Sequence, residues 1–340
     1  MPNIQTPRRH KPSARRGREP VQQRPSARAP VARGVFGHAN ELPPQVEQAP
    51  QPEPTTGTRP KPALEGSVLV TGVCGRLGKL LARELHRTDQ VVGVDRRPFA
   101  DRPKDIVHHQ VDMRRKKMKD IFRARNIRAV VHLGILHDRR RSDRDRHTWN
   151  IVAFQKLLDY MSQYEVPKLV VLSGANVYGP QANWKHPDTE TVVLRPCHIV
   201  GRVHNAASNY LRLDRPVMVM GFDPMMQVVH EKDVVRAIQL ALRPGVRGIF
   251  NIRGPGEMPL SHLIRQAGGR PRLVPSPLAK VALDQLWKLR LSSFPAQELD
   301  HLRYVCMVDD SRARTELGYE PAHSIDRALK DVRRLRYQME

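Results

Sequence analysis

The stretch SVLVTGVCGRLGKLLARELHRTDQVVGVD, residues 67–95, decides the fold. Its first run, Ser67–Thr71, is short, apolar and β-branched, which is typical of a strand buried on both faces. Residues 76–87 then carry leucines at helical spacing with charged residues on the other faces. Residues 90–95 form a second buried run. The stretch therefore predicts a strand, a tight turn, a helix and a second strand.

The turn between the first strand and the helix has the spacing of a phosphate-binding loop. Gly72, Gly75 and Gly78 let the backbone turn tightly, approach a pyrophosphate and pack the helix against the strand. Amides at the helix start, together with the helix dipole, then favour the phosphates. Asp95 ends the second strand, where a carboxylate accepts hydrogen bonds from adenosine ribose hydroxyls. A turn that only shapes an apo α/β protein is the simpler alternative, but this context favours a dinucleotide site.

Apolar runs and amphipathic stretches continue to alternate after this segment. They comprise buried runs at residues 105–112, 128–134 and 168–173 and a helical pattern at residues 150–164. Such alternation argues for a parallel sheet with helices on both faces and right-handed crossovers. The expected class is α/β, with a Rossmann-type doubly wound parallel sheet over residues 67–201. A smaller C-terminal α/β region, residues 202–340, is expected to cover the substrate. It mixes short strands with helices, which are expected over residues 232–242, 278–291 and 325–336.

Residues 1–66 differ in composition from the rest of the chain. They hold 13 of the 29 prolines, eleven Lys or Arg against five Asp or Glu, and one aromatic residue, Phe36. Such a segment has too little apolar surface to offset the entropy lost on ordering, so a disordered basic tail is predicted. The formal net charge is +24 for the chain and +18 without the tail. The folded part is therefore basic as well.

Composition also excludes several classes of protein. No window reaches the roughly 18 consecutive apolar residues of a membrane span, and the N-terminus has no apolar run that would act as a signal peptide. Cys74, Cys197 and Cys306 are too few and too scattered for a disulfide scaffold or a Cys-x-x-Cys metal site. We expect a soluble, cytoplasmic protein with reduced cysteines, no bound metal and no membrane contact.

From the glycine turn onward the chain resembles the extended short-chain dehydrogenase/reductase superfamily. Within it, the chain is similar to the NAD-dependent epimerases and dehydratases that act on nucleotide sugars. The resemblance is carried, in chain order, by TGVCGRLG (71–78), Val94-Asp95, Val111-Asp112, His132-Leu133-Gly134, Trp149-Asn150, LSGANVYGP (172–180), LRPCHIVG (194–201), VVHEKDVVRAI (228–238), FNI (250–252) and RTELGYEP (314–321). A shared order of so many pieces is difficult to obtain by chance.

The resemblance implies NAD as the cofactor and a nucleotide sugar or a related molecule as the substrate. Asp95 favours NAD because its carboxylate would repel a 2′-phosphate, whereas Arg96 and Arg97 would pair with that phosphate, so NADP stays an alternative. The implied cofactor contacts are Gly72, Gly75, Arg76, Leu77, Gly78, Asp95, Arg96, Asp112, Met113, Leu133, Gly134 and Pro196.

The residues that carry the family's chemistry are missing from their expected place. The family uses a tyrosine base with a lysine four residues later on the same helix face, and a Ser or Thr that orients the substrate oxygen. Gly174 occupies the Ser or Thr position, and Ser173 stands one residue early, which points its side chain to the other face of the strand. Residues 179–194 contain no tyrosine and two prolines, so no full crossover helix fits there.

The one Tyr-x-x-x-Lys of the chain, Tyr164 to Lys168, contains Pro167 and runs from a helix into a strand, so it is interpreted as a coincidence. The remaining catalytic candidates are Ser173, Lys185 and His186. A solvated loop is the simpler interpretation of the last two. The family's missing helix also helps to form its dimer, so a homodimer would need another interface. Three functions stay open: a nucleotide-sugar enzyme, a dinucleotide-binding sensor or scaffold without turnover, and a polyanion binder.

The third function depends on basic runs. Residues 113–147 carry thirteen Lys or Arg against four Asp or Glu, mainly in RRKKMK (114–119) and DRRRSDRDR (138–146). With the tail, such runs would bind a polyanion nonspecifically through its phosphates. Their one aromatic residue, Phe122, is expected in the core, which leaves no platform for base stacking. A solvated arginine-rich surface is the simpler interpretation. The alternative is that residues 139–146 contact a substrate diphosphate at the strand ends.

Overall fold

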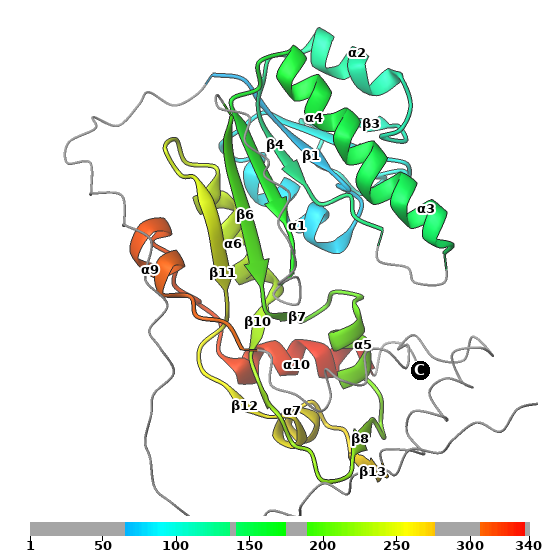
Figure 1. The fold of residues 1–340 in the computed structure, drawn as a ribbon, viewed down its shortest axis with the longest axis vertical. Coiled ribbons are helices and arrows are strands. Elements are labelled where there is room, and N and C mark those ends of the chain that lie inside the picture. The colour runs from blue at the N-terminus through cyan, green and yellow to red at the C-terminus, as the bar shows by residue number, and fades with distance from the viewer. Residues whose placement is uncertain (1–64, 137–140, 175–188, 276–306, 337–340) are drawn as a thin grey trace, which may run out of the picture. The chain divides into compact units, whose positions relative to one another are not determined.

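The computed structural model describes residues 65–136, 141–174, 189–275 and 307–336. Its centre is a seven-stranded sheet in which every pair of neighbouring strands is parallel. In spatial order the strands are β11 (Gly248–Ile252), β6 (Glu190–Pro196), β5 (Lys168–Leu172), β4 (Ile127–His132), β1 (Ser67–Thr71), β2 (Val91–Asp95) and β3 (Val107–Gln110). The first strand of the chain, β1, lies inside the sheet next to the central strand β4, and later strands are added on both sides of it (Figure 1). This is the doubly wound order, and it confirms the predicted fold class.

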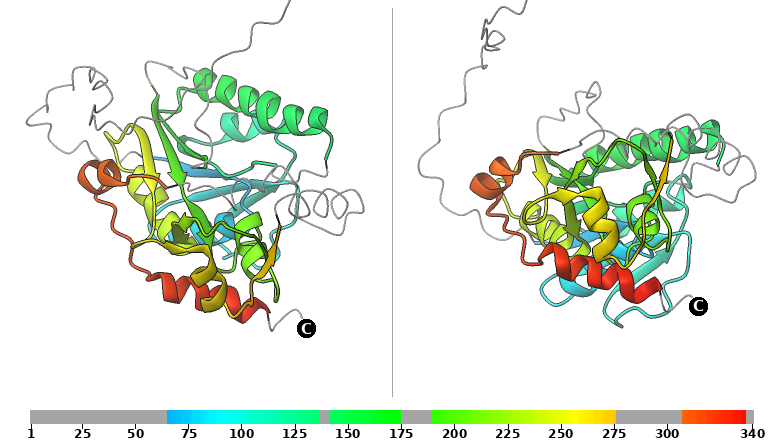
Figure 2. Two further views of the ribbon diagram at one scale, coloured as in Figure 1. Left: turned by 60° about the horizontal axis from the view of Figure 1, so that its bottom comes forward. Right: turned by 90° about the horizontal axis from the view of Figure 1, so that it is seen from below.

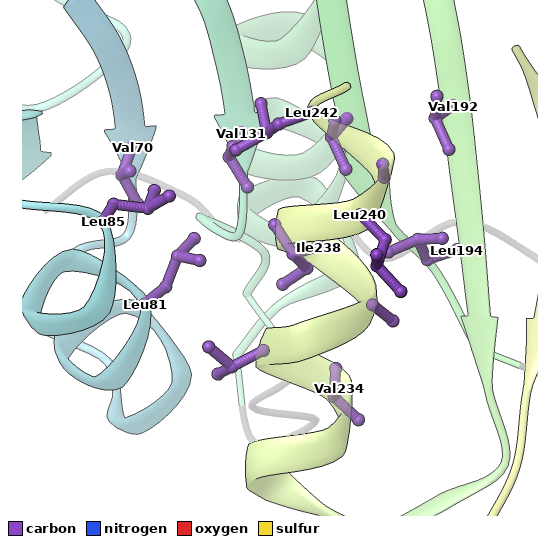
Figure 3. Packing of buried hydrophobic residues seen from close by; sticks show 14 of the residues in the cluster. Val70, Leu81, Leu85, Val131, Val192, Leu194, Val234, Ile238, Leu240 and Leu242 are labelled. Atoms are coloured by element: carbon purple, nitrogen blue, oxygen red, sulfur yellow. The ribbon is translucent and has the colours of Figure 1, made fainter. Parts of the chain in front are cut away.

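Helices cover both faces of the sheet because strand side chains alternate between the faces. Val68 and Val70 of β1 pack with α1 (Arg76–Leu85) and α6 (Glu231–Ala241). Leu69 packs on the other face, in a cluster with α2 (Lys117–Ala124) and α4 (Ala153–Gln163). Figure 3 shows side chains of α1 and α6 meeting those of β1, β4 and β6. Each fully buried Val or Leu side chain contributes about 1.5–3 kcal/mol, so these two clusters hold the layers together.

The predicted elements around the glycine turn are confirmed. The helix expected over residues 150–164 corresponds to α4 and the turn before it, but helical structure begins earlier in the chain. It starts with α3 (Asp143–His147), which Ser142 caps by accepting the N–H of Asp145 at 3.0 Å, and continues through a π-helical turn, η1 (Thr148–Val152). The segment before residue 148 lacks apolar periodicity, so its sequence did not predict a helix.

The C-terminal region contributes to the central sheet as well as to a smaller cluster of its own. The short strand β7 (His198–Val200) comes just before this region. Besides α6 and β11, the described elements of the region are α5 (Ala206–Leu211), β8 (Val217–Val219), β9 (Met225–Met226), β10 (Val228–His230), β12 (Met258–Pro259), α7 (Leu260–Gln266), β13 (Arg272–Val274), α9 (Ser311–Leu317) and α10 (Ile325–Arg336). Figure 2 shows α10 beside α7, and side chains of both helices enter the second apolar cluster. The division at residue 201 stays a prediction, although β11, which lies beyond it, pairs with β6.

None of the helices in the described ranges is long and apolar enough to cross a membrane. Apart from residues 65 and 66, the predicted tail lies outside the described residues, as does the helical pattern at residues 278–291. The cytoplasmic location and the disorder of the tail stay predictions.

Candidate functional site

The turn between β1 and α1 has no room for side chains at two of its three glycines. Gly72 has a φ of +70°, and a Cβ atom there would lie 2.8 Å from backbone atoms of Leu133 and Gly134. A Cβ atom at Gly78 would lie 2.4 Å from the carbonyl oxygen of Gly72. Glycine at these positions therefore lets β1, α1 and the end of β4 approach one another closely.

Helix α1 begins at this turn without a hydrogen bond from a capping side chain. Gly75 is the N-cap residue, and within the described chain no side chain bonds the first-turn amides and no acidic residue stands in that turn. A Cβ atom on Gly75 would meet the carbonyl oxygen of Gly72 at 3.1 Å and Nη2 of Arg97 at 4.0 Å. Arg76 and Leu77 are the first two residues of the helix. Free amides and the helix dipole make this helix start a suitable place for a phosphate or pyrophosphate.

The carboxylate of Asp95 ends β2 beside the turn and is already hydrogen-bonded. Oδ1 accepts the backbone N–H of Arg97 at 3.0 Å and its Nε at 3.3 Å. Oδ2 accepts the backbone N–H of Cys74 at 3.1 Å and Nη2 of Arg97 at 3.3 Å. The hydrogen bond to Asp95 raises the pKa of Arg97, so the guanidinium stays charged. These donors fill the roughly four acceptor positions of a carboxylate, so ribose hydroxyls would have to displace Arg97.

The indole ring of Trp149 joins the ends of three strands. The guanidinium carbons of Arg96, after β2, and Arg114, after β3, lie 5.1 and 5.0 Å from the ring centre. The indole Nε1 donates to the carbonyl oxygen of Gly134, after β4, at 2.8 Å. Sequence reasoning noted Trp149 only beside Asn150 in the resemblance and missed these contacts. These contacts connect residues far apart in the chain, so no local sequence pattern predicts them.

The π-helical turn η1 holds Trp149 and Asn150 in place. Asn150 donates through Nδ2 to the carbonyl oxygen of Leu136 at 3.1 Å and accepts the N–H of Leu136 at its Oδ1, at 2.8 Å. Both bonds fix the chain just after β4. Turns of this kind occur frequently at functional sites, which is consistent with their position at the sheet edge.

Asp112 and Met113 follow β3 at the same edge. Arg114 donates to Asp112 from Nε at 2.9 Å and from Nη2 at 2.6 Å, and this pairing lowers the pKa of Asp112. Met113 is buried, and its sulfur lies 3.3 Å from the place where a Cβ atom of Gly134 would stand. Asp112 is therefore a paired carboxylate, and Met113 fills the space beside Gly134.

His132, the last residue of β4, is a neutral packing group. Its Nδ1 lies 2.8 Å from Oγ1 of Thr71, and its ring centre lies 4.7 Å from that of Phe154. Burial lowers the pKa of His132 to about 4, so the imidazole does not take up a proton near neutral pH. The side chain ties β4 to β1 and α4.

Arg76 links the glycine turn to the C-terminal region. Its Nη2 and Nε donate to Oε1 of Glu231 at 2.8 and 3.2 Å, and its Nε also lies 3.3 Å from Oε2. Glu231 is buried at the first position of α6. Pro196, the last residue of β6, pairs with Ile252 of β11 at the same sheet edge.

The twelve residues proposed from the sequence as cofactor contacts therefore lie at the ends or just past the ends of β1, β2, β3, β4 and β6. Ligands of open parallel sheets bind at this carboxyl edge. The structure brings these residues to one edge, and their role in binding stays a prediction.

The catalytic candidates are only partly described. Ser173 follows β5, is half-buried, and donates its backbone N–H to the carbonyl oxygen of Leu194 at 2.8 Å. A Cβ atom at Gly174 would meet no described atom within 4 Å, so this position has open space. Lys185 and His186 lie outside the described residues, as do residues 175–188 as a whole, where the sequence predicts that no full helix fits. The roles of all three candidates stay predictions.

The pair Tyr164 and Lys168 is structural, as the sequence predicted. Tyr164 is the C-cap residue of α4, whereas Lys168 begins β5 and is fully buried. The ammonium of Lys168 donates to Glu190 at 3.1 Å and to the carbonyl oxygens of Arg243 at 2.9 Å and Val246 at 2.6 Å. Lys168 lies at the amino end of its strand, opposite the edge that carries the glycine turn.

A cavity of about 750 Å³ opens beside the end of β3. Its lining is mostly cationic and consists of Gln110, Val111, Asp112, Arg114, Arg115, Lys116, Lys117 and Lys156. Phe122 is buried in the core as predicted, with its ring near those of Tyr160 and Tyr164. Trp149, just past the basic run, contacts Arg114, so one aromatic ring does lie beside these cations. Polyanion binding stays a prediction.

The described cysteines are buried, and no metal site is found among the described residues. Cys74 and Cys197 are buried thiols without a disulfide, and burial raises the pKa of Cys74 to about 11. Cys306 lies outside the described residues. Within the described ranges, no group of three His, Cys, Asp or Glu side chains is arranged to hold a metal ion.

Comparison with known proteins agrees with the geometry of this edge. Residues 68–201 match the model of the NAD dependent epimerase/dehydratase family. Uncharacterized proteins of Mycobacterium tuberculosis and Mycobacterium bovis are 32% identical over 149 residues, which is 43% of this chain and 39% of theirs. The chain thus matches about two fifths of the length of these curated relatives.

Solved structures with the same fold cover more of the chain. UDP-glucose 4-epimerase of Thermotoga maritima, solved with UDP-glucose, has a TM-score of 0.63 and 19% identity, and the match covers 81% of this chain and 100% of that one. UDP-glucuronic acid 4-epimerase of Bacillus cereus, solved with UDP-glucuronic acid and NAD, has a TM-score of 0.61 and 16% identity, with 81% and 100% covered. A short-chain dehydrogenase/reductase superfamily protein of Agrobacterium tumefaciens, solved with bound NAD, has a TM-score of 0.59 and 19% identity, and the match covers 80% of this chain and 98% of that one.

Proposed function

Because residues 68–201 match the model of the NAD dependent epimerase/dehydratase family, we propose that the chain is a member of this family and binds NAD at the carboxyl edge of its sheet. The observation that carries the proposal is the start of α1 behind the turn of Gly72, Gly75 and Gly78, whose first-turn amides bond no described side chain and whose first turn holds no acidic residue. The pyrophosphate would occupy this helix start. The adenosine would extend toward Asp95 and Asp112, which follow the neighbouring strands. Proteins of the same fold have been solved with NAD bound, which supports this choice.

The class of substrate is proposed from the same proteins. Two of them were solved with UDP-glucose or UDP-glucuronic acid, so a nucleotide sugar or a related molecule is the substrate class we propose for this chain. Bound NAD supplies a hydride acceptor. The residues of this chain near the expected reaction position are Ser173, the open position at Gly174, and Pro196.

We further propose that turnover by a tyrosine base is impaired or absent. A general base contributes about 100- to 10,000-fold to a rate. The only Tyr-x-x-x-Lys pair has its lysine buried against Glu190 at the far edge of the sheet, and residues 179–194 contain no tyrosine. The protein is then a dinucleotide-binding member of its family with a sensing or scaffolding role.

Two measurements test this function. The purified full chain is denatured and any released nucleotide is identified by mass spectrometry, and NAD⁺ is titrated calorimetrically into the nucleotide-free protein. Absence of both retained nucleotide and measurable affinity would refute cofactor binding. Single-turnover hydride transfer is then followed at 340 nm with UDP-glucose and UDP-glucuronic acid. Reduction of NAD⁺ by the parent but not by a Lys185→Ala, His186→Ala variant would identify a replacement base and contradict the loss of turnover.

A further inference from the structure

We propose that the ribose end of this site accepts a 2′-phosphate, so that the chain binds NADP about as tightly as NAD. The inference rests on the proposed function, because it names which dinucleotide the same site takes. It starts from Asp95, whose carboxylate is only 8% exposed and is held by Arg97 and by the N–H of Cys74. An acidic residue at this strand end excludes a 2′-phosphate only while its charge faces the ribose. Here a guanidinium neutralises that charge.

The donors that remain are suited to a phosphate. Arg97 uses Nε and Nη2 on Asp95, and its Nη1 has no hydrogen-bond partner among the described residues. Its side chain is 59% exposed, so Nη1 is accessible to a ligand. The guanidinium of Arg96 makes no side-chain hydrogen bond to any described residue and lies over Trp149. A guanidinium presents paired N–H groups that match two phosphate oxygens, so two adjacent arginines with free donors favour this anion.

The position of these arginines agrees with the path of a dinucleotide. Nη2 of Arg97 lies 4.0 Å from the place where a Cβ atom of Gly75 would stand, at the start of α1. A ligand with its pyrophosphate at that helix start therefore passes Arg97 before it reaches the end of β3. Contact with the indole ring limits the freedom of Arg96, which lowers the entropic cost of binding. Around the ribose position the three arginines 96, 97 and 114 exceed the two carboxylates of Asp95 and Asp112 by one positive charge.

The test is calorimetric titration of the nucleotide-free full chain with NAD⁺ and NADP⁺ under the same salt conditions. We expect the two dissociation constants to agree within about tenfold. In an Arg96→Gln, Arg97→Gln variant, NADP⁺ binding should weaken by at least about tenfold more than NAD⁺ binding, because only the 2′-phosphate loses its partners and Asp95 becomes free to repel it. Arg96→Gln alone provides a second variant. The side chain of Arg96 makes no hydrogen bond to a described residue, so we expect this variant to fold like the parent.

Arg123→Gln serves as the control, and it matches Arg96→Gln in the single positive charge that it removes. Arg123 is an exposed arginine of α2 that pairs with Asp120 on the surface, so its loss should leave the ratio of the two affinities unchanged. NAD⁺ binding together with NADP⁺ binding that is more than about tenfold weaker would overturn the inference and keep the proposed function. Equal weakening of both ligands in the double variant would also overturn it. Failure of both ligands to bind would refute the proposed function itself, and the inference with it.

Discussion

Replacement of Lys168 by Met tests whether this lysine has a structural or a catalytic role. The ammonium is fully buried, and it donates to Glu190 and to the carbonyl oxygens of Arg243 and Val246. Burial lowers the pKa of Lys168, and the hydrogen bond that it donates to Glu190 offsets part of this effect. Methionine has a similar volume but no donor, so Lys168→Met removes three hydrogen bonds without leaving a large cavity.

The expected loss of stability is large. Removal of one partner of a buried ion pair costs about 3–5 kcal/mol, because the other charge stays buried. Among the described residues, the carboxylate of Glu190 then keeps the N–H of Gly245 at 3.1 Å and the more distant guanidinium of Arg247 at 3.8 Å. At about 2–4 °C per kcal/mol, the unfolding midpoint should fall on the order of 10 °C. NAD affinity at a temperature where the variant is folded should not change, because Lys168 lies at the amino edge of the sheet.

The assay is calorimetric or fluorescence-monitored thermal unfolding of the full chain, combined with NAD⁺ titration. Lys330→Met is the control, because Lys330 pairs with Asp326 at 2.8 Å but both side chains are exposed, and such pairs contribute about 0–1 kcal/mol. A Lys168→Met, Glu190→Gln double variant should recover part of the lost stability, because it removes the unpaired charge. An unfolding midpoint close to that of the parent, with cofactor binding lost, would refute the structural assignment of Lys168.

Three further predictions concern the glycine turn, pH and the link to α6. Gly75→Asp should change stability little, because the cap it adds to α1 is offset by a Cβ atom 3.1 Å from the carbonyl oxygen of Gly72, while charge repulsion lowers NAD affinity more than about tenfold. An equal loss of affinity in Gly75→Asn would assign the effect to shape instead. Burial lowers the pKa of His132 in the folded state to about 4, whereas the unfolded value is about 6.5. The contribution of neutral His132 to the free energy of unfolding is therefore complete above about pH 6.5. It is lost as the pH falls from about 6.5 to about 4, by about 3 kcal/mol at most. Urea unfolding across this range should be less pH-dependent in His132→Gln, and an unchanged slope would contradict the burial argument. Arg76→Met should destabilise the fold by roughly 2–4 kcal/mol because Glu231 stays buried and unpaired. The urea midpoint should recover in the double variant Arg76→Met, Glu231→Gln. A double variant without recovery would show that the arginine acts through packing alone.

Local patterns in the sequence were sufficient to predict most of the central sheet. The bounds predicted for β1, Ser67–Thr71, and for α10, Ile325–Arg336, match the structure because a β-branched apolar run and a helical stripe each determine their own conformation. The glycine turn was equally readable, since positive φ and close backbone approach restrict the residue type at Gly72. These features depend on neighbours within a few residues.

The remaining features depend on contacts between distant segments. The pairing of Asp95 with Arg97 is local, but a carboxylate at a strand end has several partners within reach, and only the packed turn selects one. The contacts of Trp149 with Arg96 and Arg114 require the ends of three strands to meet. The membership of β11 in the central sheet was missed for the same reason, because the sequence after residue 201 changes pattern while the backbone returns to β6.

The pairing of β11 with β6 also has a consequence for how the chain folds during its synthesis. During translation, β6 is complete at residue 196, but its outer partner is complete only at residue 252. Until then β6 presents an unpaired backbone edge beside a buried apolar face, and such edges promote association between nascent or truncated chains. A fragment that ends at residue 201 would keep this edge permanently, so it should aggregate, whereas one that extends past β11 and α9 should stay dispersed.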